Sequence, residues 1–489
     1  MRRIKKLIVS LLLGVLAMMA LILAVQDGAT NQNFVLAVYN AREPVEIHQT
    51  DSYTVHLPLV IRRYDPSYVS PFGIMMHGNV DDVAGLQTMK DGGSKWVKTT
   101  LNWSTIEPTQ DAYYWSNFDT KAQNAQAAGM DVFVLFNKNP SWAATLPGGP
   151  VTDTQDLVDF VTLMAERYDC DGVDDAPGSP CVHYWSFYGE PDNGDLERAQ
   201  GGKGYWGHNG AGYAAMLSQI SPAIHTANPQ AKVLIGGLAY DWFEEDGGPF
   251  VRSFFTDTLS ALDGYAGGAS AYIDAAAFHF YPISASRWPT IREKALEVRG
   301  IMERHNVDDL SLICPEMGYW SSPEFGSSEQ GQAQRLVQMY VRGLSVDMQP
   351  LSWHKVFDDA EPSSAEDLYP SRTSGLLDVY GQLKQSYYAY QTMTQELTYA
   401  RYLRELQAAD AEGYVFQTSD GYEKTVLWAT ASSTTVSFSY SCLRMVDTLG
   451  NEYYPITDGL AGWDEDGQVN GSILLRVYEN APSYVEPCH

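Results

Sequence analysis

Eight apolar runs of strand length follow one another from Pro71 onward, and stretches with helical spacing separate them. Such an alternation predicts parallel strands joined by helices, since each helix returns the chain to the start of the next strand. Eight repeats are typical of a (β/α)8 barrel. The predicted strands are Phe72–Met76, Trp96–Leu101, Asp131–Phe136, Val182–Tyr188, Lys232–Gly236, Ala275–Phe280, Leu310–Cys314 and Pro350–Val356.

Helical spacing is found between most of these runs and once more after the last of them. A doubly wound sheet is the competing architecture, but it would place a glycine-rich phosphate loop after the first strand, and no such loop follows Met76. The barrel is therefore the better prediction. The expected helices are Phe118–Ala128, Thr154–Tyr168, Gly212–Thr226, Thr290–His305 and Glu329–Ser345, with Gln385–Gln395 closing the barrel.

Beyond about residue 398 the runs become short, β-prone and separated by turns rich in Gly, Asp and Ser. This pattern is typical of a small all-β sandwich. We therefore expect a spacer over 26–70, a barrel over 71–397 and a β-sandwich domain over 398–489. The expected sandwich strands are Tyr414–Ser419, Lys424–Ala429, Thr434–Tyr440, Leu443–Thr448 and Ile473–Tyr478.

The first 25 residues carry an export signal. Four basic residues within the first six precede an apolar run, Leu7 to Val25, that only Ser10 and Gly14 interrupt. Such a segment is either a cleaved signal peptide or a retained membrane anchor through residues 7–25, and the sequence leaves both open. In either case the remaining chain is expected to be secreted or extracytoplasmic, where disulfides form.

Five cysteines would lie in that compartment. Cys170 and Cys181 flank a loop rich in Asp, Gly and Pro, which favours a local bridge, and Cys442 could pair with Cys488. Cys314 is then left over within an apolar run. The cysteines and histidines show no zinc-site spacing, so no metal is expected.

The formal charge of -28 argues against nucleic acid and anionic membrane surfaces as partners. A neutral substrate fits that balance better.

Two carboxylates come at the ends of predicted strands. Glu190 follows the fourth strand directly after Gly189, and Glu316 follows the seventh. Because the carboxyl ends of barrel strands meet at one mouth, both side chains are expected there. The strand ends nearby add polar and aromatic groups: Asn102, Trp103, His279, Tyr281, Trp353 and His354.

Paired carboxylates among aromatic rings suit glycoside cleavage, in which one carboxyl protonates the leaving oxygen and the other attacks or stabilises the anomeric carbon. Aromatic faces supply a stacking surface for sugar rings.

Several segments, in this order along the chain, resemble the clan A glycoside hydrolases, most closely families 39 and 5. Glu190-Pro191 resembles the acid/base motif, and Glu316-x-Gly318-Tyr-Trp320 resembles the nucleophile motif. His279-Phe-Tyr281 resembles the strand-six His-x-Tyr. Weaker similarities cover Trp103 to Pro108, Pro140 to Ala143 and Gly375 to Tyr387.

The resemblance implies a retaining enzyme with Glu190 as general acid/base and Glu316 as nucleophile, acting on β-linked neutral sugars of an oligo- or polysaccharide without a cofactor. It implies that Tyr281 orients Glu316, with His279 beside it. Trp353 would floor the first sugar subsite, Trp103 could line it, and Trp320 would bind substrate.

Two positions depart from the clan pattern. Gly189 stands where the clan has an Asn that contacts the sugar 2-hydroxyl. Either the substrate is unusual, or Asn137 or Asn193 substitutes for that Asn, or activity is reduced. The strand-two Arg of the clan is also missing, with Lys98 or Asn102 near its place. The alternative interpretation is a non-catalytic carbohydrate-binding protein on a degenerate glycosidase barrel.

Overall fold

The computed structural model describes residues 70–283, 286–360 and 370–488. The predicted signal or anchor segment, 1–25, and the spacer up to residue 69 lie outside the described residues. Among the helices of the described ranges, none is long and apolar enough to cross a bilayer. Ser70 to the C-terminus forms one compact unit.

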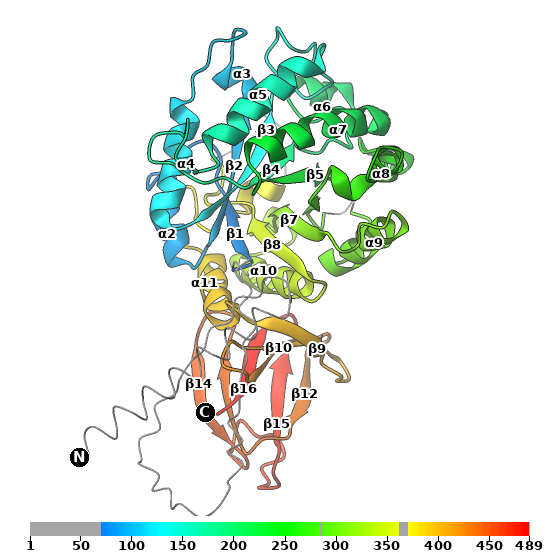
Figure 1. Cartoon of the computed structure of the whole chain (residues 1–489). Helices are drawn as coiled ribbons and strands as arrows, with labels where there is room; N and C mark the ends of the chain where they lie inside the picture. Colours follow the sequence, from blue (N-terminus) through cyan, green and yellow to red (C-terminus); the bar gives the residue numbers. More distant parts are fainter. Residues whose placement is uncertain (1–69, 284–285, 361–369, 489) are drawn as a thin grey trace, which may run out of the picture. The chain divides into compact units, whose positions relative to one another are not determined.

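Eight parallel strands close into a barrel in chain order, which confirms the predicted fold (Figure 1). Glu316 lies within the seventh strand rather than after it, because that strand continues three residues past its predicted end. The strands are β1 Phe72–Met75, β2 Trp96–Asn102, β3 Asp131–Asn137, β4 Tyr184–Phe187, β5 Lys232–Leu238, β6 Ala275–Phe280, β7 Ser311–Met317 and β8 Met348–Trp353.

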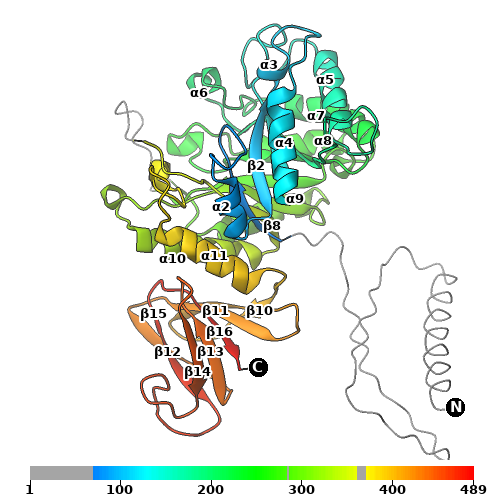
Figure 2. The ribbon, with the colours of Figure 1, turned by 90° about the vertical axis from the view of Figure 1, so that its left-hand side faces the viewer.

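Helices surround this barrel, as Figures 1 and 2 show. Four of them, α2, α3, α6 and α8, were not expected, since short helices give little periodic signal. The helices are α2 Leu86–Asp91, α3 Trp103–Ile106, α4 Ser116–Ala128, α5 Thr154–Arg167, α6 Leu196–Gln200, α7 Gly210–Ala227, α8 Phe254–Asp263, α9 Ile291–Arg304, α10 Glu329–Leu344 and α11 Gln385–Leu397. Short 3-10 turns cover Glu244–Asp246, Ala269–Ala271, Pro323–Phe325 and Pro370–Thr373.

Strand register decides which side chains meet inside the barrel. His279 of β6 pairs with Glu316 of β7, so the two side chains share one face of the sheet. Met317, one residue further on, pairs with Phe280 and with Trp353. These three apolar side chains are fully buried, with 1% exposure or less, and belong to the core. The polar side chains at the paired positions, His279 and Glu316, therefore belong to the candidate site.

The C-terminal region has a six-stranded antiparallel sheet, in the order β14-β13-β16-β11-β10-β9, and a two-stranded sheet of β12 and β15. Both lie beside α10 and α11 in the two ribbon views (Figures 1 and 2). The strands are β9 Arg401–Glu405, β10 Ala411–Gln417, β11 Glu423–Ala429, β12 Ser433–Phe438, β13 Cys442–Val446, β14 Glu452–Thr457, β15 Ile473–Tyr478 and β16 Ser483–Pro487. The boundary at residue 397 stays a prediction, although α11 ends there.

Ion pairs join the six-stranded sheet to the barrel's last helices. Arg342 of α10 binds Glu412 of β10, with an Nη2–Oε2 distance of 2.6 Å. Glu396 of α11 contacts Lys424 and accepts from Arg444 at 2.9 Å. Because these groups are largely withdrawn from water, the pairs fix the packing of the sheet against α10 and α11.

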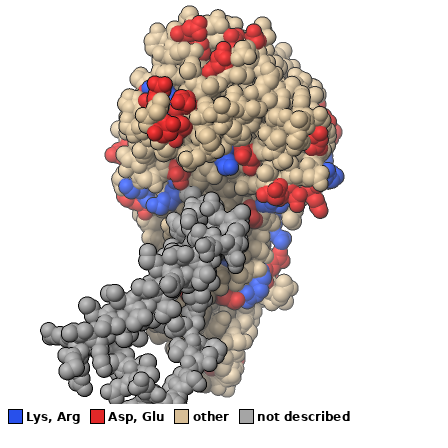
Figure 3. Space-filling model, viewed as in Figure 1, with Lys and Arg blue, Asp and Glu red and all other residues tan. Residues whose placement is uncertain are grey.

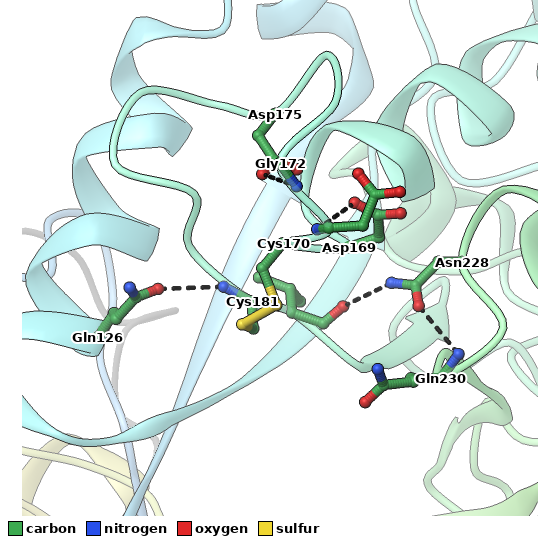
Figure 4. The surroundings of a disulfide bond; sticks show 10 residues. Gln126, Asp169, Cys170, Gly172, Asp175, Cys181, Asn228 and Gln230 are labelled. Atoms are coloured by element: carbon green, nitrogen blue, oxygen red, sulfur yellow. Dashed lines mark hydrogen bonds between the residues drawn. A yellow bond between two sulfur atoms is a disulfide. The ribbon is translucent and has the colours of Figure 1, made fainter.

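Both predicted disulfides are present, Cys170–Cys181 and Cys442–Cys488, and Cys314 is buried and free. Around the first bridge, the Cys181 N–H donates to the Gln126 side chain (Figure 4). Single oxygens of Asp169, Asp171 and Asp175 lie within 4.8 Å of one another. The Asp169 and Asp175 carboxylates accept from the backbone N–H groups of Asp171 and Gly172, so these carboxylates stabilise the turn.

Acidic side chains cover more of the barrel face seen in Figure 3 than basic ones do. This distribution agrees with the formal charge of -28.

Candidate active site

The fourth strand ends in an unusual backbone turn that presents Glu190. Tyr188 and Glu190 both have left-handed conformations, with φ of 62° and 53°. The Glu190 N–H donates to the Gly237 carbonyl at 3.0 Å, which attaches the turn to β5. Non-glycine residues rarely adopt this conformation, and such strain gathers at functional sites.

Glu316 lies near the end of β7, where two side chains bind its carboxylate. The Tyr281 hydroxyl donates to Oε1 at 2.7 Å, and the Lys98 ammonium lies 2.8 Å from Oε2. Lys98 comes from β2 and is 1% exposed. A buried cation thus pairs with Glu316, and Lys98 rather than Asn102 occupies the position next to the carboxylate.

His279 of β6 lies between the two carboxylates. Its Nδ1 is 3.4 Å from Glu190 Oε1, and its Nε2 is 3.9 Å from Glu316 Oε2. Beneath the ring, the buried Lys294 ammonium donates to the His279 carbonyl at 2.8 Å and also binds the Ala239 carbonyl. The structure therefore brings Glu190, His279, Tyr281 and Glu316 together at one mouth.

A basic segment, residues 198–204, also contacts Glu190. Arg198 Nη2 lies 2.6 Å from Glu190 Oε2, and Lys203 Nζ lies 3.7 Å from the same oxygen. Sequence reasoning missed both cations, because Arg198 lies in the short helix α6 and Lys203 in the loop after it, and their contacts with a strand end leave no periodic pattern. The glycines around Lys203 were the available signal, since they indicate a close backbone approach.

Charge decides the protonation of the two carboxyls. Burial opposes ionisation of Glu190, but the positive charges of Lys203 and Arg198 and the hydrogen bond from His279 outweigh it and lower its pKa. Burial likewise opposes ionisation of Glu316, and nearby His279 and Lys98 hold its pKa well below the usual value. Both carboxyls are therefore ionised at neutral pH in the free protein.

A histidine pair lies beside Tyr281, which binds Glu316. His354 Nε2 lies 3.0 Å from Nε2 of His77, which follows β1, and its ring packs edge-on against Tyr281. Burial lowers the pKa of His354 to about 3, against the attraction of Glu316. His354 is thus neutral at the site. It lies one residue after Trp353, the residue that was expected to floor the first sugar subsite.

Two tryptophans expected to contact sugar lie in the core. Trp353 is 0% exposed, stacks on Tyr340 of α10 and donates its indole N–H to the Ser374 carbonyl at 2.7 Å. Trp103 is also 0% exposed and donates to Glu107. Neither ring has a face left for a sugar, so the expected subsite floor is not formed by them.

The other predicted binding residues are largely buried and donate hydrogen bonds to backbone carbonyls of the loops. The Trp320 indole donates to the Phe325 carbonyl at 2.9 Å, and its ring stacks on Tyr319. Asn193 is 0% exposed and binds backbone groups of Asp195 and Gly204. Asn137 donates to the Gly202 carbonyl at 3.1 Å.

Asn137 keeps one free group at the mouth. Its buried Oδ1 has no hydrogen-bond partner among the described residues. This oxygen therefore has acceptor capacity that no side chain of the described residues uses. Space also remains at Gly189 itself, since an added Cβ would meet only Leu135 there, at 3.4 Å.

A surface hollow of about 540 Å³ lies apart from this mouth, and Tyr240, Glu244, Arg252 and Arg304 line part of it. Neither Glu190 nor Glu316 lines it, so it is not the site described above.

The sequence matches no protein-family model and no curated protein. Solved structures do match. A family 39 glycoside hydrolase from Bacteroides cellulosilyticus is 17% identical with a TM-score of 0.61, over 86% of this chain and 81% of that one. A family 39 β-xylosidase from Caulobacter crescentus is 15% identical with a TM-score of 0.55, over 86% and 97%.

A third match is a glucosidase from Croceicoccus marinus, 14% identical with a TM-score of 0.58, over 85% of this chain and 95% of that one. Matches at sequence identities this low support a similarity of fold but say nothing about the substrate. The chain has a fold similar to that of solved family 39 glycoside hydrolases, which belong to clan A.

Proposed function

We propose that this protein is an extracellular retaining glycoside hydrolase that cleaves β-linked sugars by a double displacement. The observation that carries the proposal is the pair Glu190 and Glu316, at the ends of β4 and β7, with His279 between them. Two carboxyls at one mouth are the arrangement that most glycoside hydrolases use. The solved structures with the same fold include a xylosidase and a glucosidase.

In the first step, Glu316 attacks the anomeric carbon while Glu190 protonates the departing oxygen. Lys98 and Tyr281 keep the Glu316 carboxylate ionised and fix its orientation, as a nucleophile requires. In the second step, ionised Glu190 removes a proton from the water that releases the sugar. The sugar on the nucleophile side of the cleaved bond is proposed to be neutral, because the ionised Glu316 and the net negative charge of the protein would repel an anionic sugar.

The proposal is tested by Glu316→Ala with activated aryl β-glycosides. We expect hydrolysis to fall by about a thousandfold or more, because no covalent intermediate forms. Glu324→Ala is the matched control, since Glu324 is an exposed glutamate in the same β7–α10 connection. Full activity of Glu316→Ala would reject the assignment.

Product stereochemistry tests the mechanism separately. A retaining enzyme releases the β-anomer first, which proton NMR detects before mutarotation. The alternative, a non-catalytic carbohydrate-binding protein, predicts sugar binding with no turnover of any glycoside. The Gly189 departure motivates that alternative, and the intact carboxylate pair argues against it.

The proposed location outside the cytoplasm rests on the basic and apolar N-terminal segment, with support from two disulfides. N-terminal sequencing of the exported protein would distinguish cleavage of that segment from its retention as an anchor.

A further inference from the structure

The basic segment, residues 198–204, is held against the β4 end by its backbone. The Gly204 N–H donates to the Gly189 carbonyl at 2.8 Å, while the Gly204 carbonyl accepts from the Asn193 amide. A Cβ on Gly204 would lie 2.7 Å from Pro191 Cα, so only glycine allows this approach. The position of the cations beside Glu190 is therefore built into the fold.

The guanidinium of Arg198 is only partly used. One nitrogen, Nη2, binds Glu190, and the ring of Phe250 lies 5.0 Å from Cζ. The buried Nε has no hydrogen-bond partner among the described residues. An unpaired buried donor on a charged group is costly, so the guanidinium of Arg198 has hydrogen-bonding capacity that its contact with Glu190 does not use.

Lys203 also has donors to spare. Its side chain is 51% exposed and reaches Glu190 only at 3.7 Å. With Lys98, three cations surround the two carboxylates of the mouth. One positive charge thus remains uncompensated among these five groups, in a protein whose formal charge is -28.

The charged state of Glu190 conflicts with its proposed first task, because a general acid must carry a proton. Removal of the two cations from Glu190 would raise its pKa and allow it to take a proton from solvent. An anionic group on the substrate would compete for exactly these cations. The titratable or charged groups around Glu190 are Arg198, Lys203, His279, Lys294, Asp192, Tyr281 and Glu316.

We propose that Arg198 and Lys203 recognise a carboxylate on the leaving group of the substrate, as in an acidic sugar joined to a neutral glycone. This inference rests on the proposed function, since it takes Glu190 as the residue nearest the departing oxygen. Arginine favours the carboxylate, because its planar fork matches two oxygens at once. The neutral glycone remains on the Glu316 side.

In the resulting step, the substrate carboxylate takes over the contacts of Arg198 and Lys203, and Glu190 gains one proton from solvent. Glu316 then forms its bond to the anomeric carbon as the carbon–oxygen bond to the leaving group breaks. The Glu190 proton passes to that oxygen, and the carboxylate departs with the leaving group, still ionised. No oxidant or further reactant is needed.

The test compares two aryl β-glycosides with the same neutral glycone. One carries a free carboxylate on the nitrophenyl leaving group, and the other carries its methyl ester, which removes the charge and keeps the size. For the wild-type protein, we expect kcat/KM for the carboxylate to exceed that for the ester by about tenfold or more. To choose the glycone, methyl ester substrates with different neutral sugars are tested first, and a sugar whose methyl ester substrate is cleaved is used for both compounds.

The preference should disappear when the cations are removed. In the double variant Arg198→Gln/Lys203→Gln, we expect the ratio to fall to about one or below, because Glu190 then repels the carboxylate. Lys203→Gln alone is the safer variant for folding, since its side chain is half exposed, and it should give an intermediate ratio. Lys232→Gln, an exposed lysine at the other end of β5, should keep the wild-type ratio.

A wild-type ratio of one or less, with the ester still cleaved, would overturn the recognition of a carboxylate and leave the glycosidase proposal standing. A ratio that survives the double variant would overturn it as well. Failure to cleave any member of either series would instead count against the proposed function itself.

Discussion

At the scale of single residues, the site is set by cations that the sequence did not assign. Lys98 and Asn102 were the two candidates for the place of the missing strand-two Arg, and in the structure Lys98 of β2 pairs with Glu316. Arg198 and Lys203 could not be assigned to Glu190, because their contacts with it depend on tertiary structure, and the glycines around Lys203 indicate only a close backbone approach. Glu190, Glu316, His279 and Tyr281 could be placed at one mouth from the sequence, because each follows or ends an apolar strand.

Replacement of Lys98 tests the charge balance at Glu316. Lys98 favours the ionised form and lowers the pKa of Glu316, so Lys98→Met should raise that pKa. The nucleophile must be ionised, and therefore the acidic limb of the kcat/KM profile should move to higher pH, by about one unit or more. Activity lost at acidic pH should be partly regained as the pH rises.

Lys121→Met provides the comparison, since this lysine of α4 binds the Thr100 carbonyl and not Glu316. A pH profile that is identical in Lys98→Met and the wild type would contradict the role of Lys98.

At the scale of elements, strand alternation explains both what the sequence predicted and where it failed. The barrel strands were recognisable because their apolar runs are local and continuous. Trp353 was expected at the mouth, yet it packs against α10, and the next residue, His354, contacts Tyr281 instead. A shift of one residue moves a side chain to the opposite face of a sheet, and apolar runs do not fix that register.

Substitution of Trp353 distinguishes a core residue from a binding residue. Trp353→Phe removes the hydrogen bond to Ser374 and leaves a small cavity, so the free energy of unfolding should fall by about 1–3 kcal/mol. KM for an aryl glycoside should stay within about twofold, because the ring does not reach the substrate. Chemical denaturation and steady-state kinetics on the same preparation check both points, and a large rise in KM with unchanged stability would restore the binding role.

At the scale of the whole molecule, the C-terminal sheets are attached to the barrel by ion pairs and by a continuous apolar core. Trp428 and Tyr484 of the sheets belong to the same buried cluster as the barrel side chains. Sequence texture indicated a second β region but not this shared core, since contacts between distant segments leave no local pattern. The predicted sandwich strands omitted β9, β14 and β16. Strands β9 and β14 are the partly exposed edges of the six-stranded sheet and are weakly apolar, whereas β16 is an inner strand of only five residues.

Arg342→Ala tests this attachment. Glu412 would lose its bidentate partner while largely shielded from water, and we expect the free energy of unfolding to drop by about 2 kcal/mol. Arg404→Ala is the matched control, because it breaks a similar pair with Glu423 on an exposed surface, and the cost there should be below about 0.5 kcal/mol. Equal losses in the two variants, measured by urea denaturation, would show that burial does not decide the strength of the pair.

The free thiol of Cys314 gives the barrel an internal reporter. It lies at 0% exposure in the middle of β7, two residues before Glu316, and burial raises its pKa to about 12. A thiol reagent therefore reaches it only when β7 separates from its neighbours, while the other cysteines of the described chain are bridged. The rate of alkylation would therefore measure how often β7, the strand that carries the proposed nucleophile, opens. An inhibitor that binds only the closed barrel would lower this rate, and the decrease would grow with the affinity of the inhibitor.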